Sequence, residues 1–260
     1  MQKLKAAAVS YLNTKPFMYG LMHEDMSDRI DLTLNIPSMC ADKLLQGEVD
    51  FALVPVAVLP RLKDPIIISD YCIGTVGAVK TVGIYAEVPI EEIEELYLDF
   101  HSRTSVELAK ILLREYWQLT PRLLPAEPGF LDKIQGKAAA VVIGDRTIGL
   151  EKKYAYTYDL GEMWQRHTGL PFVFAAWVSR RPLPDDFLTE LNQAFAYGIH
   201  SVPELMYILP SPSPDFALEE YFTRYISYEL DERKKAGLEL FLRKIGMQKE
   251  LHYQSGELTL

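Results

Sequence analysis

The sequence places short apolar segments directly before polar segments that open a helical pattern, and this alternation constrains the fold more than any other feature. Residues 4–9 form the first apolar segment, which we expect to be a β-strand. The polar run from Ser10 to Thr14 follows it, and Pro16 suits the first turn of a helix. Residues 30–55 repeat the order strand, helix, strand, with Ser38 placed to cap the helix. This order predicts an α/β fold with a ligand site at the carboxyl ends of its strands.

The residues after the first strand allow two interpretations. Asn13 or Thr14 can serve only as the cap of the helix that begins at Pro16. Alternatively, Asn13 faces a ligand together with Ser10 and Tyr11, at the amino end of that helix. The nine residues 9–17 do not by themselves decide between the two.

Composition excludes several classes of function. The net charge of -9 argues against non-specific nucleic-acid binding, which needs a basic surface, but a local cluster of donors can still hold a small anion. No apolar segment reaches the length of a membrane span, and the amino terminus lacks the layout of a signal peptide. We therefore expect a cytoplasmic protein with no membrane partner. Cys40 and Cys72 lie among apolar residues and are expected to be buried free thiols.

The chain is long enough for two lobes, and its pattern indicates where it crosses between them. Glycines flank the strand-like residues 77–85, as in a crossing segment, and the alternation of strand and helix then begins again. An aromatic strand over residues 173–179 is expected to return to the first lobe. We predict lobe I from residues 1–78 and 179–260, with a helical carboxyl-terminal part, and lobe II from residues 79–178.

A second polar junction connects a strand and a helix within residues 97–117. Ser102, Thr104 and Ser105 approach the start of the helix, where unpaired backbone N–H groups and the helix dipole favour an anion. Arg103 adds a forked donor for a carboxylate. A well-capped helix with a solvated arginine explains the same residues, but two such junctions in separate lobes favour a binding site.

The sequence lacks the motifs of phosphate-bearing cofactors, of zinc sites and of the serine-nucleophile elbow. Its five histidines have no metal-ligand spacing, and His101 alone lies near a candidate site. Asp145 at a strand tip would repel an anion, so a role toward Arg146 or nearby backbone N–H groups is favoured. These residues predict a two-lobed protein, without a metal or cofactor, that binds a small anionic ligand and either retains or converts it.

Several segments, in this order, resemble the chorismate dehydratases of the futalosine route to menaquinone. They are residues 9–17, 47–55, 102–105, 143–145, 159–164 and 168–172. The resemblance implies a type 2 periplasmic-binding-protein-like fold, with mixed sheets, flanking helices and a central cleft. It also implies a lyase that removes water from chorismate, a dicarboxylate, to give 3-[(1-carboxyvinyl)oxy]benzoate. The family has a serine where this chain has Thr81, which keeps the hydroxyl and adds a methyl group.

By this resemblance, Asn13 is the principal catalytic side chain, and it donates a hydrogen bond to the departing hydroxyl or to a substrate carboxylate. The implied substrate-binding residues are Ser10, Tyr11, Ser38, Thr81, Ser102, Arg103, Thr104, Ser105, Gly144, Asp145 and Phe172. No general base is evident in the motifs, and the substrate's own enolpyruvyl carboxylate is one candidate proton acceptor.

Two other functions remain open. The first is a cytoplasmic protein that binds a small carboxylate on the same fold without converting it. The second is the sister enzyme of the same pathway, which makes a dihydroxynaphthoate, although the motifs at residues 11–14 and 143–145 fit the dehydratase better. The oligomeric state is not predicted.

Overall fold

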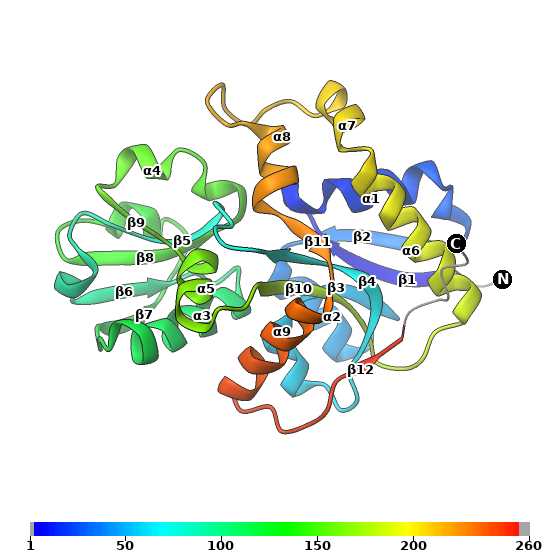
Figure 1. Cartoon of the computed structure of the whole chain (residues 1–260), viewed down its shortest axis with the longest axis horizontal. Helices are drawn as coiled ribbons and strands as arrows, with labels where there is room; N and C mark the ends of the chain where they lie inside the picture. Colours follow the sequence, from blue (N-terminus) through cyan, green and yellow to red (C-terminus); the bar gives the residue numbers. More distant parts are fainter. Residues whose placement is uncertain (1–2, 255–260) are drawn as a thin grey trace.

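The computed structural model describes residues 3–254 and contains two β-sheets, each flanked by helices (Figure 1). The larger sheet has the strand order β11-β4-β10-β3-β1-β2, and β12 pairs with β4. Its strands are β1 (Leu4–Val9), β2 (Ile30–Asn35), β3 (Phe51–Pro55), β4 (Ile66–Thr75), β10 (Phe172–Ser179), β11 (Ser227–Glu229) and β12 (His252–Tyr253). The sheet is mixed, because β1 runs parallel to β2 and β3 while β10 runs antiparallel to β3 and β4.

The smaller sheet has the order β7-β6-β8-β5-β9. Its strands are β5 (Val82–Ala86), β6 (Glu95–Leu98), β7 (Arg122–Pro125), β8 (Ala138–Ile143) and β9 (Tyr156–Asp159). The helices of this lobe are α3 (Arg103–Leu112), α4 (Leu150–Lys153) and α5 (Leu160–Thr168). Helices α3 and α5 pack against each other and against β8 and β5, which buries the apolar side of the sheet.

The remaining helices belong to the larger sheet. They are α1 (Lys15–His23), α2 (Pro37–Gln46), α6 (Asp185–His200), α7 (Val202–Ile208), α8 (Leu218–Glu220) and α9 (Glu232–Lys244). Helices α1 and α6 approach very closely, since a Cβ atom on Gly20 would lie 1.8 Å from the Ala194 carbonyl oxygen. None of the helices within residues 3–254 is both long and apolar enough to cross a membrane.

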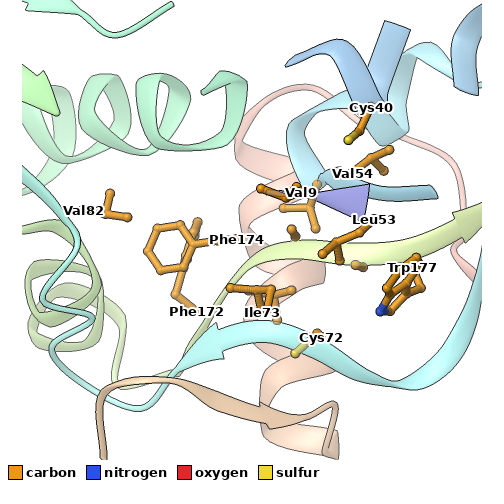
Figure 2. Packing of buried hydrophobic residues seen from close by; sticks show 14 of the residues in the cluster. Val9, Cys40, Leu53, Val54, Cys72, Ile73, Val82, Phe172, Phe174 and Trp177 are labelled. Atoms are coloured by element: carbon orange, nitrogen blue, oxygen red, sulfur yellow. The ribbon is translucent and has the colours of Figure 1, made fainter. Parts of the chain in front are cut away.

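Aromatic side chains fill the core of the larger lobe. Trp177 is fully buried and stacks on Phe195 with ring centres 4.8 Å apart, and Phe17 packs on the edge of Trp177 at 5.9 Å. Figure 2 shows Trp177 and the two thiols among aliphatic side chains from neighbouring strands. Cys40 and Cys72 are buried free thiols, as predicted, and burial raises the pKa of each to about 12.

The sheets divide the chain differently from the prediction at one crossing. We expected residues 79–178 in lobe II, but β10 pairs with β4 of the larger sheet from Phe172 onward. Residues 172–178 therefore lie in the larger sheet. An apolar strand that is buried on both faces indicates a central position in a sheet, but not which of two sheets contains it.

The carboxyl-terminal part also contains two short strands, at residues 227–229 and 252–253, that the sequence analysis did not predict. These residues form β11 and β12, which extend the larger sheet beside β4. Strands of two or three residues are too short to show a periodic apolar pattern.

Two predicted helix caps are also absent. Neither Thr14, at the start of α1, nor Ser38, inside α2, makes a side-chain capping hydrogen bond. Each helix instead has a proline in its first turn, where the missing N–H group has no intrahelical partner to lose.

Candidate functional site

A cavity of about 60 Å³ lies between the two sheets. The larger-sheet lobe contributes Val9, Tyr11, Asn13, Pro37, Leu53, Pro55, Ile73, Phe174 and Ala175 to its lining, and the rest of the lining is Val79, Thr81, Val82, Ser102, Ser105, Ile143 and Gly144. In Figure 2, the Phe174 ring lies between Val82 on one side and Ile73 and Val9 on the other. The cavity has room for about four water molecules, so a ring with two carboxylates requires the lobes or their side chains to move apart.

Six of the twelve predicted site residues line this cavity: Tyr11, Asn13, Thr81, Ser102, Ser105 and Gly144. The carboxyl ends of β1 and β8, the start of β5 and the amino end of α3 bring these residues together from distant parts of the chain.

Asn13 lies in a single 3₁₀ turn, Leu12–Thr14, between β1 and α1. Thr14 Oγ1 donates to Asn13 Oδ1 at 3.3 Å, and the Tyr228 hydroxyl donates to the Asn13 backbone carbonyl at 3.0 Å. Because Oδ1 already accepts one hydrogen bond, the Asn13 amide nitrogen is the part of the side chain best suited to donate to a ligand.

The start of α3 forms the polar wall of the smaller-sheet lobe. The Ser105 backbone N–H donates to Ser102 Oγ at 3.0 Å, and Ser102 Oγ donates to Ser105 Oγ at 2.9 Å. Both serines are buried. The helix begins at Arg103, three residues earlier than the predicted first apolar residue, so Ser105 lies within its first turn. Buried hydroxyls and backbone N–H groups at this helix end suit an anion.

Arg103 and Thr104 lie outside the lining and make contacts between the lobes. Arg103 donates to Asp42 of α2 at 2.7 Å, and Thr104 Oγ1 accepts from the Ala57 backbone N–H at 3.2 Å. In this structure Arg103 pairs with a carboxylate of the protein itself, and its predicted role toward a ligand carboxylate stays a prediction.

Gly144 is constrained by its own backbone and by the opposite lobe. Its φ of +67° is in the left-handed region, and a Cβ atom there would lie 2.7 Å from the Tyr11 ring. Tyr11 Oη lies 2.8 Å from His101 Nδ1, and the Leu12 backbone N–H donates to both Asp145 carboxylate oxygens at 3.2 Å. Asp145 thus pairs with a backbone N–H, as favoured from the sequence.

Burial favours the neutral forms of Tyr11 and His101. Burial raises the pKa of Tyr11 to about 12, although the nearby Arg146 lowers it. Burial, and then the charge of Arg146, lower the pKa of His101, while Asp99 raises it. Tyr11 and His101 are therefore an uncharged hydrogen-bonded pair at neutral pH.

Thr81 lies on a segment whose backbone is held by a buried carboxylate. The backbone N–H groups of Val79 and Lys80 donate to Asp159 at 3.0 Å and 2.7 Å, and Lys80 adopts a positive φ of 69°. The Lys80 ammonium lies 5.1 Å from the centre of the Phe216 ring. These contacts direct the Thr81 hydroxyl toward Tyr221 Oη, at 2.9 Å.

Three other predicted residues do not line the cavity. Ser10 is exposed, and Ser38 follows the cavity-lining Pro37. Phe172 is buried in the core, with its ring centre 5.2 Å from Trp164 and 5.1 Å from Phe241. Phe174 occupies the cavity wall instead, because irregular pairing of β10 with β4 changes the direction of its side chains between Val173 and Ala175.

The sequence analysis did not identify Tyr221 or the apolar part of the lining. The apolar residues carried no signal apart from their ordinary strand pattern, and Tyr221 lies 140 residues away from its partner Thr81. Among the residues that the structure describes, the lining contains no Asp, Glu, His, Lys or Arg. No group of three His, Cys, Asp or Glu side chains within residues 3–254 is arranged to hold a metal ion.

The two lobes, the mixed sheets and the cavity between them define a protein of the periplasmic-binding-protein-like fold class. Protein AF1704 from Archaeoglobus fulgidus has a TM-score of 0.72 at 15% identity, covering 93% of this chain and 96% of that one. The Candida albicans CA3427 product, described as having the generic periplasmic binding protein fold, has a TM-score of 0.62 at 12% identity over 100% and 98% of the chains. The sulphonate-binding protein SsuA from Escherichia coli has a TM-score of 0.55 at 14% identity over 96% and 94%. The predicted fold class is confirmed.

The chain belongs to the menaquinone biosynthesis family, whose sequence model matches residues 4–246. A curated relative, the chorismate dehydratase of Thermus thermophilus, is 27% identical over 242 residues, which covers 82% of this chain and 85% of the relative. The family predicted from the sequence motifs is therefore confirmed.

Proposed function

We propose that this protein removes water from chorismate to form 3-[(1-carboxyvinyl)oxy]benzoate. The single observation that carries the proposal is the buried cavity in which the Asn13 amide and the hydroxyls of Thr81 and Ser102 come from opposite lobes. Membership of the menaquinone biosynthesis family and the similarity to a chorismate dehydratase support the choice of reaction.

The chemistry of the substrate suits a site built from neutral donors. Chorismate carries two carboxylates, and the loss of one ring proton and the adjacent hydroxyl as water leaves an aromatic ring. Much of the driving force is therefore in the substrate. The protein has to orient the dianion and stabilise the charge that develops as the proton and then the hydroxyl leave.

The residues divide this work between the lobes. In the proposal, Ser102, Ser105 and the backbone N–H groups at the start of α3 bind one carboxylate, and Thr81 completes the polar wall. Asn13 donates from its amide to the departing hydroxyl or to a carboxylate. Because the lining within the described residues contains no charged side chain, the proposed proton acceptor is the enolpyruvyl carboxylate of the substrate.

Closure of the lobes is part of the proposal, since the cavity is too small to admit chorismate as it stands. The contacts Arg103 to Asp42 and Leu12 to Asp145 join the lobes around the cavity. In the proposal, substrate enters with these contacts broken, the side chains that line the cavity move to make room for it, and the contacts then form again and exclude water from the reacting atoms. We propose that the reaction runs in the cytoplasm, because a dianion does not cross a lipid bilayer unaided.

The test is incubation of the purified protein with chorismate, followed by liquid chromatography with mass detection of the dehydrated product. Asn13→Ala should lower kcat by about 10²-fold to 10³-fold, the usual effect of removing one preorganised donor. Asn35→Ala is the matched control, because Asn35 is also partly buried, at the end of the parallel strand β2, but its side-chain amide donates to Thr33 Oγ1 outside the cavity lining.

Recovery of unchanged chorismate from the wild-type protein, with binding detected by calorimetry, would indicate a binding protein and contradict the proposal. Full activity of Asn13→Ala would contradict the role of Asn13 while leaving the reaction established.

A further inference from the structure

Tyr221 is a fully buried tyrosine that lies between two candidate site residues from opposite lobes. Its hydroxyl is 2.9 Å from Thr81 Oγ1. The Asn13 side chain lies close enough to the same phenol to lower its pKa. Asn13 and Thr81 both line the cavity, so one hydroxyl behind the cavity wall connects both of them.

The local structure fixes the Tyr221 ring. Tyr221 begins a π-helical turn, Tyr221–Tyr225, that directly follows α8, and such turns occur frequently at functional sites. Its ring packs on Phe216 at 5.2 Å and on Phe222 at 5.6 Å between ring centres. Figure 1 shows this part of the chain continuing into β11, which anchors it to the larger sheet through β4.

The same carboxyl-terminal segment holds Asn13 at two points. Tyr228 in β11 donates to the Asn13 backbone carbonyl at 3.0 Å, and Tyr221 contacts the Asn13 side chain. The backbone contact fixes where the residue lies, and the phenol of Tyr221 is placed to influence which way the amide faces. The hydrogen bond from Thr14 Oγ1 to Asn13 Oδ1, at 3.3 Å, is long and constrains the amide weakly.

Tyr221 does not act as an acid or a base. Burial raises its pKa above the ordinary value, and the negative charge of Asp145 raises it further, while the hydrogen bonds from Thr81 and Asn13 lower it. The phenol therefore keeps its proton at neutral pH, with one O–H to donate and lone pairs that accept.

We propose that Tyr221 is a positioning residue that orients the Asn13 amide and the Thr81 hydroxyl toward one substrate group in the closed protein. The inference rests on the proposed function of the cavity, but the orientation of Asn13 can be measured independently of any reaction. Packing alone requires only the ring of Tyr221, whereas this role requires its hydroxyl.

The first experiment follows the Asn13 side-chain amide by NMR on ¹⁵N-labelled protein, with the resonance assigned from its loss in Asn13→Ala. Tyr221→Phe keeps the ring and removes the hydroxyl, and it should shift or broaden the Asn13 amide resonance. Tyr154→Phe is the matched control, because Tyr154 is also buried and donates to the Leu131 carbonyl far from the cavity. An unchanged Asn13 resonance in Tyr221→Phe would overturn the inference, whatever reaction the protein catalyses.

The second experiment measures chorismate turnover by the same variants. Tyr221→Phe should lower kcat by about tenfold with KM changed less than about twofold, because the hydroxyl orients a group that acts in the transition state. In the Asn13→Ala background, the same substitution should lower kcat by a smaller factor than in the wild type, since one of the two groups that Tyr221 orients is absent. Equal losses in both backgrounds, or a change confined to KM, would overturn the inference.

A second pair of variants makes the test independent of the folding of Tyr221→Phe. Thr81→Val removes the hydroxyl that Tyr221 contacts, while Thr81→Ser keeps it. The Asn13 amide resonance should move in Thr81→Val and stay in place in Thr81→Ser. The opposite pattern would contradict the proposed coupling. Absence of product from the wild-type protein would refute the proposed function, and the NMR result would still decide the role of Tyr221.

Discussion

The substitution Gly144→Ala tests whether the closed lobes require a residue without a Cβ atom at this position. Two effects add in the variant. The first is backbone strain, because φ at Gly144 is +67°. The second is a steric clash across the cleft, because the new Cβ atom would lie 2.7 Å from the Tyr11 ring.

The structure gives the size of each effect. A non-glycine residue in the left-handed region costs about 1 kcal/mol. An ordinary contact for a Cβ atom begins near 3.4 Å, so the ring must move by about 0.7 Å, the difference between 3.4 and 2.7. A shift of this size, directed away from His101, would lengthen the Tyr11 to His101 contact from 2.8 Å to about 3.5 Å, at which the hydrogen bond is lost. Because misplacement by about 1 Å costs about 10²-fold, we expect kcat/KM to fall by about 10-fold to 10²-fold.

The matched control is Gly149→Ala. Gly149 has a similar φ of +88°, but nothing lies within 4 Å of its added Cβ atom. Thermal unfolding and chorismate turnover should be measured for both variants. Both should lose about 1 kcal/mol of stability from strain, and only Gly144→Ala should lose activity.

Equal activity of the two variants would refute the reasoning, because it would show that the ring of Tyr11 and the lobe contacts around it accommodate the methyl group without cost. A crystal structure of Gly144→Ala with an unmoved Tyr11 ring would refute it in the same way.

Two further predictions concern contacts between the lobes. Arg103→Ala should raise KM about twofold to fivefold with little change in kcat, because the pair with Asp42 is partly exposed and contributes at most about 1 kcal/mol to closure. Steady-state kinetics measures this effect. Recovery of KM in the charge-swapped double variant Arg103→Asp with Asp42→Arg would support the prediction, whereas an unchanged KM in Arg103→Ala would contradict it. Burial lowers the pKa of His101 below its unfolded value, so its neutral form contributes stability that is fully present above pH of about 6.5 and is lost as the pH falls through the lower, folded value. His101→Gln should therefore flatten the acid side of a plot of Tm against pH between 5 and 8, and an identical acid slope in the variant and the wild type would contradict this assignment.

The sequence predicted the bounds of a strand or helix best where its apolar pattern extended over many residues. The strand Leu4–Val9 has the predicted bounds, and the strand Ala138–Ile143 lies within the predicted apolar segment. Each contains an unbroken run of buried apolar residues, 6–9 in the first and 139–143 in the second. The Ser102 cap of α3 was also visible, since capping depends on residues three positions apart. Short edge strands such as Ser227–Glu229 were missed because they are formed only by pairing with β4.

The candidate site shows the same limit. Asn13, Ser102 and Ser105 were found because each follows a strand at the start of a helix, a local arrangement that the sequence shows directly. Phe172 was chosen in place of Phe174 because the irregular pairing that turns β10 is a property of the sheet. Arg103 was expected to bind a ligand because nothing local to it reveals that Asp42 lies 2.7 Å away.

By itself, the sequence determined the α/β class, the two polar junctions and the family, since these depend on residue types and their spacing over short segments. Only the tertiary structure decided which polar groups line the cavity and which join the lobes. The reason is physical: the contact between Tyr221 and Thr81, and the approach of Tyr11 to Gly144, connect residues more than 130 positions apart, and only packing of the two lobes brings them together.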